Sequence, residues 1–231
     1  MNTSDGTAAA LSEVESLMLE SFQKEPFHNL RLLYCDQVSA RVPGGTCSDK
    51  TLSFVELARR RGFDVSLHSG YIDGEDKHRL ARVCVNGRVY FADVGNGWPA
   101  LKLYPAEREV AYRFFGIGFR TEVAGTRLSV FCERHGREAL QLEVDVRAKP
   151  EESIRAAIER RFTSGIVYPF SKDVRFSRLV QNRFMFLRGE RLEMYGEDAY
   201  EEVNGIRRED LPRVLLEYFG YDLRGVEWRE R

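Results

Sequence analysis

Three residues of the types used in nucleophilic catalysis occur in order along the chain: Cys47, His78 and Asp93. A thiolate, an imidazole and a carboxylate can act as a nucleophile, its general base and the group that orients the base. Cys47 follows residues 43–46, Pro-Gly-Gly-Thr, and precedes a helical pattern. We therefore expect Cys47 at or just before a helix N-terminus, a position that favours the thiolate.

His78 and Asp93 lie at the two ends of a predicted hairpin. Residues 78–85 and 88–94 are strand-like and flank Asn86-Gly87, a strong signal for a two-residue type I′ turn. With that turn, His78 and Asp93 become diagonal neighbours on one face, with Cβ atoms about 7–8 Å apart. A slip of one residue would place them on opposite faces. The register therefore predicts an orienting pair.

Each of these residues also has a structural interpretation. A histidine at the start of a strand is usually a polar edge residue, and an aspartate before a glycine often forms a turn. Cys35, Cys84 and Cys132 stand among or beside apolar residues and are interpreted as small buried side chains. No pair of cysteines has CxxC spacing, so we expect no metal site.

Helical and strand patterns alternate along the rest of the chain. Residues 1–10 are expected to be disordered, and a capping box at Ser12 predicts a helix to about Gln23. Ser48 or Asp49 is expected to cap the helix after Cys47. Residues 174–187 alternate as one long strand. Further helices are predicted from residue 48 to residue 62, from Pro150 and at 209–219, and further strands at 63–67, 128–133, 138–147 and 191–195.

Composition excludes several classes of protein. The 231 residues carry 35 basic and 36 acidic side chains, so no overall positive field favours nucleic acid. The N-terminal segment lacks the features of a secretory signal, and no stretch approaches the roughly 18 apolar residues of a membrane span. We expect a cytoplasmic enzyme with no membrane or nucleic-acid partner.

Four separated segments of the chain share a pattern with one known family. They are Pro26-Phe27-His28-Asn29-Leu30, Pro43-Gly44-Gly45-Thr46-Cys47, His78-Arg79-Leu80 and Asp93-Val94-Gly95-Asn96-Gly97. In this order they resemble the motifs Pro-Phe-Glu-Asn-Leu, Arg-Gly-Gly-x-Cys, His-x-x-Leu and Asp-Val-Gly-Phe-Gly of the arylamine N-acetyltransferases. The segment Tyr168-Pro169-Phe170-Ser171 is also similar to that family.

The resemblance implies an α+β fold in three parts. Residues 1–62 would form a helical subdomain carrying the nucleophile, and residues 63–149 a central antiparallel β-barrel carrying His and Asp. Residues 150–231 would form an α/β lid. By the same resemblance, Cys47 is the nucleophile, His78 the base and Asp93 the orienting group of a triad like that of transglutaminases and papain-like proteases.

The activity implied is acyl transfer in two half-reactions. Cys47 would take an acyl group from a thioester, with acyl-CoA, and acetyl-CoA first of all, as co-substrate and no bound cofactor. A small-molecule amine or hydroxyl acceptor would then receive it. The alternatives are an amide synthase that uses a thioester on an acyl carrier protein, a transglutaminase-like hydrolase, and a non-catalytic binding member of the family.

The motifs depart from the family pattern beside the nucleophile. Pro43 replaces the arginine, His28 the upstream glutamate and Asn96 the phenylalanine of the family motifs, while Ser48-Asp49 replaces an aromatic-glutamate pair. These changes predict an altered acceptor pocket and entrance. The residues expected to bind substrate are Phe27, Gly44, Gly45, Thr46, Gly95, Asn96, Trp98 and Phe170.

Overall fold

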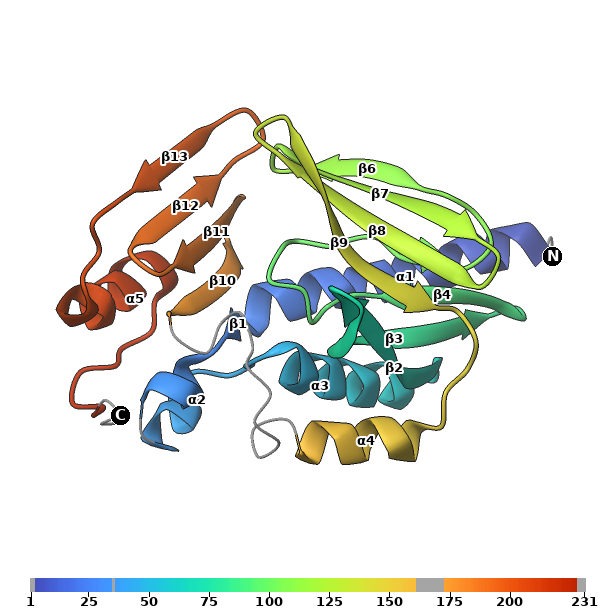
Figure 1. The fold of residues 1–231 in the computed structure, drawn as a ribbon, viewed down its shortest axis with the longest axis horizontal. Helices are drawn as coiled ribbons and strands as arrows, with labels where there is room; N and C mark the ends of the chain where they lie inside the picture. Colours follow the sequence, from blue (N-terminus) through green and yellow to red (C-terminus); the bar gives the residue numbers. More distant parts are fainter. Residues whose placement is uncertain (1–2, 35, 161–172, 228–231) are drawn as a thin grey trace.

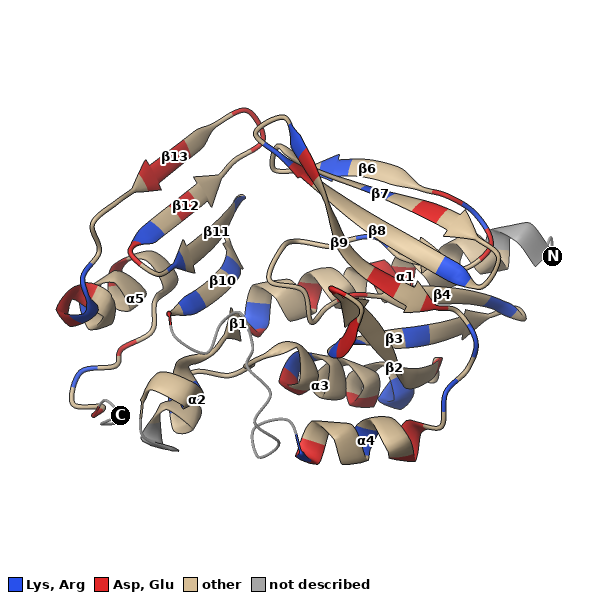
Figure 2. Ribbon diagram, in the orientation of Figure 1, with Lys and Arg blue, Asp and Glu red and all other residues tan. Residues whose placement is uncertain are grey.

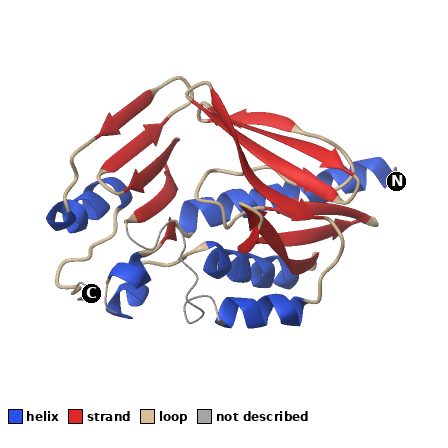
Figure 3. Cartoon of the chain, viewed as in Figure 1, coloured by secondary structure: helices blue, strands red, loops and turns tan. Residues whose placement is uncertain are grey.

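The structure, a computed structural model, describes residues 3–34, 36–160 and 173–227 and contains two antiparallel sheets with helices around them (Figures 1 and 3). Tyr168, Phe170 and the rest of the predicted 168–171 motif lie outside the described residues. The helices are α1 (Thr3–Lys24), α2 (Leu30–Leu33), α3 (Cys47–Arg60), α4 (Glu151–Glu159) and α5 (Leu211–Phe219), with 3₁₀ turns η1 (Asp36–Ala40) and η2 (Arg208–Asp210).

The larger sheet is a curled half-barrel of eight strands in the order β5-β4-β3-β2-β9-β8-β7-β6 (Figure 1). It does not close into the expected barrel, since β5 and β6 are its two edges in the described part of the chain. Its strands are β2 (Asp64–Ile72), β3 (Glu75–Val85), β4 (Arg88–Ala92), β5 (Tyr104–Pro105), β6 (Ala111–Phe114), β7 (Ile117–Ala124), β8 (Arg127–Arg134) and β9 (Arg137–Asp145).

The smaller sheet joins both ends of the chain. Its order is β1-β10-β11-β12-β13, so the N-terminal strand β1 lies beside β10. The smaller sheet therefore combines strands from the predicted lid, residues 150–231, with one strand from the predicted helical part, residues 1–62. Helix α4, although it belongs to residues 150–231, packs on β2 of the half-barrel. The strands are β1 (Phe27–His28), β10 (Arg175–Val180), β11 (Arg183–Arg188), β12 (Arg191–Tyr195) and β13 (Tyr200–Val203).

The register of the hairpin between β3 and β4 is confirmed. Val85 pairs with Arg88 and Ala81 with Ala92. Asn86 has φ 50° and Gly87 φ 74°, as a type I′ turn requires. The observed register is the predicted one, and it places His78 and Asp93 on the same face of the hairpin.

The long strand predicted over 174–187 is wrong. The segment is a hairpin of β10 and β11, in which Val180 pairs with Arg183 across a turn at residues 181–182. Gln181 takes φ 54° there. Gln-Asn carries no glycine, so the turn had no strong local signal. A reversal at this point changes which residues share a face, and this bears on the site below.

Two helix starts also differ from the predictions. Helix α1 begins at Thr3, within the segment expected to be disordered, and Ser12 lies inside it. Three consecutive alanines at 8–10 are strong helix formers that extend the helix toward the N-terminus. Helix α3 is capped by Thr46, and Asp49 occupies the third helical position instead of the cap.

Helices α1, α3 and α4 cover one side of the half-barrel, and α5 packs on the smaller sheet (Figure 1). Lys50 of α3 is fully buried, and its Nζ donates to the carbonyls of Ser21 and Glu25 at the end of α1. Acidic and basic side chains are interspersed over the strands and helices in this view (Figure 2). No helix in the described ranges is long and apolar enough to cross a membrane.

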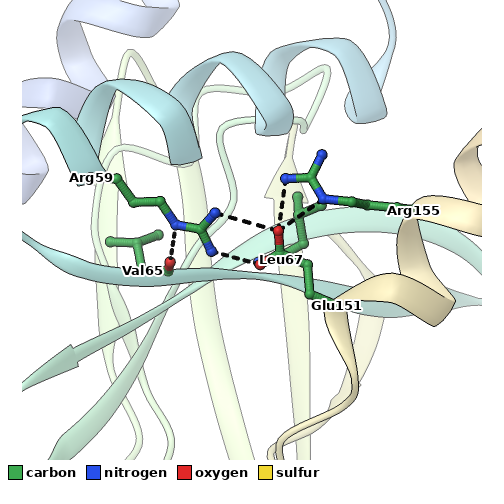
Figure 4. A network of polar contacts seen from close by, with 5 residues as sticks. All are labelled: Arg59, Val65, Leu67, Glu151 and Arg155. Carbon is green, nitrogen blue, oxygen red and sulfur yellow. Dashed lines mark hydrogen bonds and ion pairs between the residues drawn. The ribbon is translucent and has the colours of Figure 1, made fainter.

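Glu151 at the start of α4 connects three elements (Figure 4). Its carboxylate accepts hydrogen bonds from Arg59 Nη2 at 2.6 Å, Arg155 Nη2 at 2.7 Å and the Leu67 N–H at 3.2 Å. Burial alone would raise the pKa of Glu151, but the hydrogen bonds from the two arginines lower it to about 2. The network fixes α4 to α3 and β2.

We expect Glu151→Gln to lower the free energy of unfolding by about 1–2 kcal/mol at neutral pH. Because the pKa of Glu151 is depressed in the folded state, its stabilisation is present above the unfolded pKa of about 4.3 and is lost as pH falls toward 2. Urea unfolding of both proteins from about pH 7 to pH 3 measures this. The exposed neighbour provides a control, Glu152→Gln, and an equal loss in both variants would contradict the assignment.

Candidate active site

Cys47 is the first residue of α3, and the cap of that helix holds it in place. The backbone N–H and the hydroxyl of Thr46 both donate to Asp49 Oδ2, each at 2.9 Å. The positive end of the helix therefore lies at the Cys47 thiol, which is only 6% exposed. This arrangement favours a thiolate at a fixed position.

The glycines before Cys47 allow the turn to pack against the segment that leads into β1. A Cβ on Gly44, which has φ 81°, would lie 2.3 Å from the Pro26 carbonyl oxygen. The Gly45 N–H donates to that same oxygen at 3.2 Å, and the His28 N–H donates to the Gly45 carbonyl at 2.8 Å. The turn before Cys47 is thus hydrogen-bonded to the edge strand of the smaller sheet.

His28 and Pro43 contact each other directly. The Leu30 N–H donates to His28 Nδ1 at 3.3 Å, so the neutral ring carries its proton on Nε2, which donates to the Pro43 carbonyl at 3.1 Å. Burial lowers the pKa of His28 to about 4, although the Pro43 hydrogen bond acts in the opposite direction. Where the family motifs have glutamate and arginine, this chain has a neutral hydrogen-bonded pair.

His78 and Asp93 form the pair that the hairpin register predicted. His78 Nε2 lies 2.6 Å from Asp93 Oδ1, and Asp93 is fully buried. The other carboxylate oxygen, Oδ2, accepts a hydrogen bond from Asn96 Nδ2 at 2.8 Å. Asn96 is held in turn, because its Oδ1 accepts the Trp98 N–H at 3.0 Å. Both oxygens of Asp93 are therefore satisfied in one orientation.

The electrostatics of the site favour an ion pair between Cys47 and His78. Burial opposes the thiolate, but the hydrogen bond and charge of His78, with a smaller contribution from Arg79, lower the pKa of Cys47. Burial also opposes the imidazolium, but Asp93 and the Cys47 thiolate raise the pKa of His78 to about 10. Since Nε2 faces Asp93, the ring presents Nδ1 to the thiol.

Gly95 permits the close approach of the loop after Asp93 to the nucleophile. A Cβ there would lie 2.9 Å from both Cα and Cβ of Cys47 and 2.8 Å from the Arg79 carbonyl oxygen. Thr51 of α3 donates to that same carbonyl at 3.0 Å. Helix α3, which begins with Cys47, and the β3–β4 hairpin, which carries His78, therefore pack directly against each other.

A pocket of about 230 Å³ opens beside Cys47 and His78. Of the residues expected to bind substrate, Phe27, Gly95, Asn96 and Trp98 line it, whereas Gly44, Gly45 and Thr46 lie behind Cys47 and Phe170 is outside the described residues. Phe27, Ile72, Trp98, Leu142 and Phe186 form its apolar walls.

Four further polar residues of the pocket lining were not predicted: Lys77, Gln141, Arg175 and Arg188. Arg175 pairs with Arg188 across the β10–β11 hairpin, so recognising the turn at 181–182 would have placed both on one face. Among the described residues, no group of three or more His, Cys, Asp or Glu could hold a metal ion.

A family model of N-acetyltransferases matches residues 11–228. The chain therefore belongs to the arylamine N-acetyltransferase family, as its motifs indicated, and it is an enzyme of the N-acyltransferase class. Comparison with curated proteins gave no match.

Solved structures of arylamine N-acetyltransferases share the fold at low sequence identity. That of Nocardia farcinica has a TM-score of 0.76 and 20% identity over 93% of this chain and 84% of its own. That of Salmonella typhimurium has a TM-score of 0.72 and 20% identity over 93% and 87%. That of Mycobacterium marinum, solved in complex with CoA, has a TM-score of 0.74 and 16% identity over 91% and 86%.

We expect Cys47 to react with iodoacetamide far below the pKa of about 8.5 of a free thiol. Because the pKa of Cys47 is lowered, its thiolate persists as pH falls and is lost only below that lowered value. Asp93→Asn removes the charge that stabilises the imidazolium, so the midpoint of the pH–rate curve moves to higher pH. Mass spectrometry of the modified cysteine measures the rate.

Cys84 provides a matched control for this experiment, because it is a free cysteine that does not line the pocket. Cys84→Ala should retain the fast reaction and Cys47→Ala should abolish it. A midpoint near 8.5 in the unmodified protein, or one that Asp93→Asn does not move, would exclude the ion pair.

We expect Asn96→Ala to slow acylation of Cys47 by about 10- to 100-fold, because a hydrogen bond to a charged group contributes about 1.5–3 kcal/mol. Without the Asn96 donor the Asp93 carboxylate is no longer held in one orientation and can turn away from His78, which weakens its hydrogen bond to the imidazolium, so the apparent pKa of Cys47 rises. The pH profile of alkylation checks this effect separately from the rate. A variant that is slower but keeps the same midpoint would show that Asn96 acts on substrate alone.

Proposed function

We propose that the protein transfers an acyl group from acyl-CoA to an amine through a Cys47 acyl-enzyme, in a ping-pong reaction. The observation that carries this proposal is the buried series Cys47, His78 and Asp93 beside an apolar pocket. The CoA complex of the Mycobacterium marinum relative supports CoA as the thiol of the donor. Acetyl is the first acyl group to test.

In the first half-reaction the Cys47 thiolate attacks the thioester carbonyl carbon. The tetrahedral intermediate collapses with cleavage of the bond to the CoA sulfur, and the His78 imidazolium gives its proton to the departing thiolate. His78 is then neutral, and Cys47 carries the acyl group. The backbone N–H of Cys47, at the N-terminus of α3, would donate to the oxyanion.

In the second half-reaction the acceptor amine attacks the acyl-enzyme. Neutral His78 takes the amine proton, the bond to Cys47 Sγ breaks, and the thiolate–imidazolium pair is restored. Asp93 and Asn96 keep the ring oriented through both steps. In this role the smaller sheet, which supplies Phe27 and Phe186 to the pocket, would act as the lid that limits access of water.

Intact mass after incubation with acetyl-CoA tests this proposal. We expect one acetyl group on the protein, its absence from Cys47→Ala, its presence on Cys84→Ala, and its loss when an amine such as aniline is added with formation of the amide. An adduct that survives in Cys47→Ala would exclude Cys47 as the nucleophile.

The same experiment separates the competing activities. Acylation by a carrier-protein thioester, but not by CoA thioesters, would indicate an amide synthase. Release of free carboxylic acid at an equal rate with and without amine would indicate a hydrolase. No adduct from any thioester would indicate a binding member of the family.

A further inference from the structure

Arg175 is a cation of the pocket that has no side-chain partner among the residues that the structure describes. Of its charged residues, Lys77 Nζ lies 2.7 Å from Glu75 Oε2, and Arg188 Nε lies 2.9 Å from Glu193 Oε2. Arg175 makes no side-chain hydrogen bond or ion pair within residues 3–34, 36–160 and 173–227, and its Nε is buried without a partner. A buried polar atom without a partner calls for an explanation.

The nearby carboxylates do not neutralise Arg175. Glu193 is engaged at both oxygens, since Oε2 accepts from Arg188 and Oε1 accepts from the Tyr195 hydroxyl at 3.2 Å. Asp173 contributes charge, but within the described part of the chain it forms no hydrogen bond or ion pair with the Arg175 side chain. Burial and the neighbouring Arg188 both lower the pKa of Arg175.

The pleat of β10 directs Arg175 toward the pocket. Successive side chains of a strand alternate, so Arg175 and Ser177 share one face. Ser177 Oγ donates to the Gly97 carbonyl at 2.7 Å, which identifies that face as the one toward the Asp93 loop. The backbone of Arg175 is fixed by Asn29, whose Oδ1 accepts the Arg175 N–H at 2.8 Å. The strand therefore places the Arg175 side chain in the pocket wall.

The chemistry and size of the pocket indicate what this cation binds. A half-buried cation that has no partner among the described residues lowers the stability of the folded protein. A carboxylate would relieve this cost, because a planar guanidinium can bind it through two parallel hydrogen bonds. A cavity of about 230 Å³ holds an acyl group and a small acceptor, but not the nucleotide end of CoA. The phosphates of CoA are separated from its sulfur by the whole pantetheine arm.

We propose that Arg175 is a specificity-determining residue that binds a carboxylate on the substrate inside the pocket. This proposal rests on the proposed acyl transfer at Cys47. The carboxylate belongs either to a dicarboxylic acyl group on the donor or to an acceptor that carries both an amine and a carboxylate.

Matched substrate pairs with Arg175→Gln distinguish these two sources. Succinyl-CoA and butyryl-CoA test the donor, and 4-aminobenzoate and 4-aminobenzamide test the acceptor. We expect the ratio of kcat/KM for the anionic over the neutral member of one pair to fall by about 10- to 100-fold. The control is Arg183→Gln, which changes a half-exposed arginine of the same sheet outside the pocket and should leave the ratio unchanged.

Calorimetric binding to Cys47→Ala tests the same recognition without acyl transfer. Tighter binding of the anionic member, lost when Arg175→Gln is added, supports the proposal even where no transfer occurs, so failure of the two proposals can be told apart. Because Arg175 has no side-chain partner in the described ranges, Arg175→Gln should not lower Tm. Unchanged ratios in both pairs, an equal rise of KM for all CoA donors, or a large fall in Tm would each overturn the proposal.

Discussion

The buried carboxylate of Asp93 is the constraint on which the site depends. An unpaired charge in a buried position is costly, so Asp93 is tolerated only because His78 and Asn96 satisfy one oxygen each. The same two bonds set the orientation of the imidazole and leave its Nδ1 to Cys47. Because the charge of Asp93 must be paired, the end of the hairpin at His78 and the loop with Asn96 are held in one arrangement beside Cys47.

The sequence predicts the reactive side of the site better than the binding side. The Asn86-Gly87 turn is a short-range signal, and one correct register placed His78 beside Asp93. The turn at 181–182 has no glycine, and its misassignment hid Arg175 and Arg188, which come together only across a hairpin. The pairing of β1 with β10 was also beyond reach, because two residues carry no periodicity and their partner lies far along the chain.

The departures from the family motifs divide into two physical kinds. His28 and Pro43 replace a charged pair by a neutral hydrogen bond behind the nucleophile, so the turn keeps its shape by other means. Asn96 changes the pocket itself, because a polar side chain that supports Asp93 stands where the family has an aromatic ring. The first kind leaves the turn before Cys47 in place, and the second changes the lining of the pocket.

Strand β1 has only two residues, yet it hydrogen-bonds to β10 on one side and to the turn before Cys47 on the other. A rotation of the smaller sheet away from the half-barrel would therefore strain the turn that positions the sulfur. This strain disfavours a hinge motion of the smaller sheet for substrate exchange. It favours entry of substrate into a pocket that is already open. A larger substrate would then need changes in the residues that line the pocket rather than a movement of the smaller sheet.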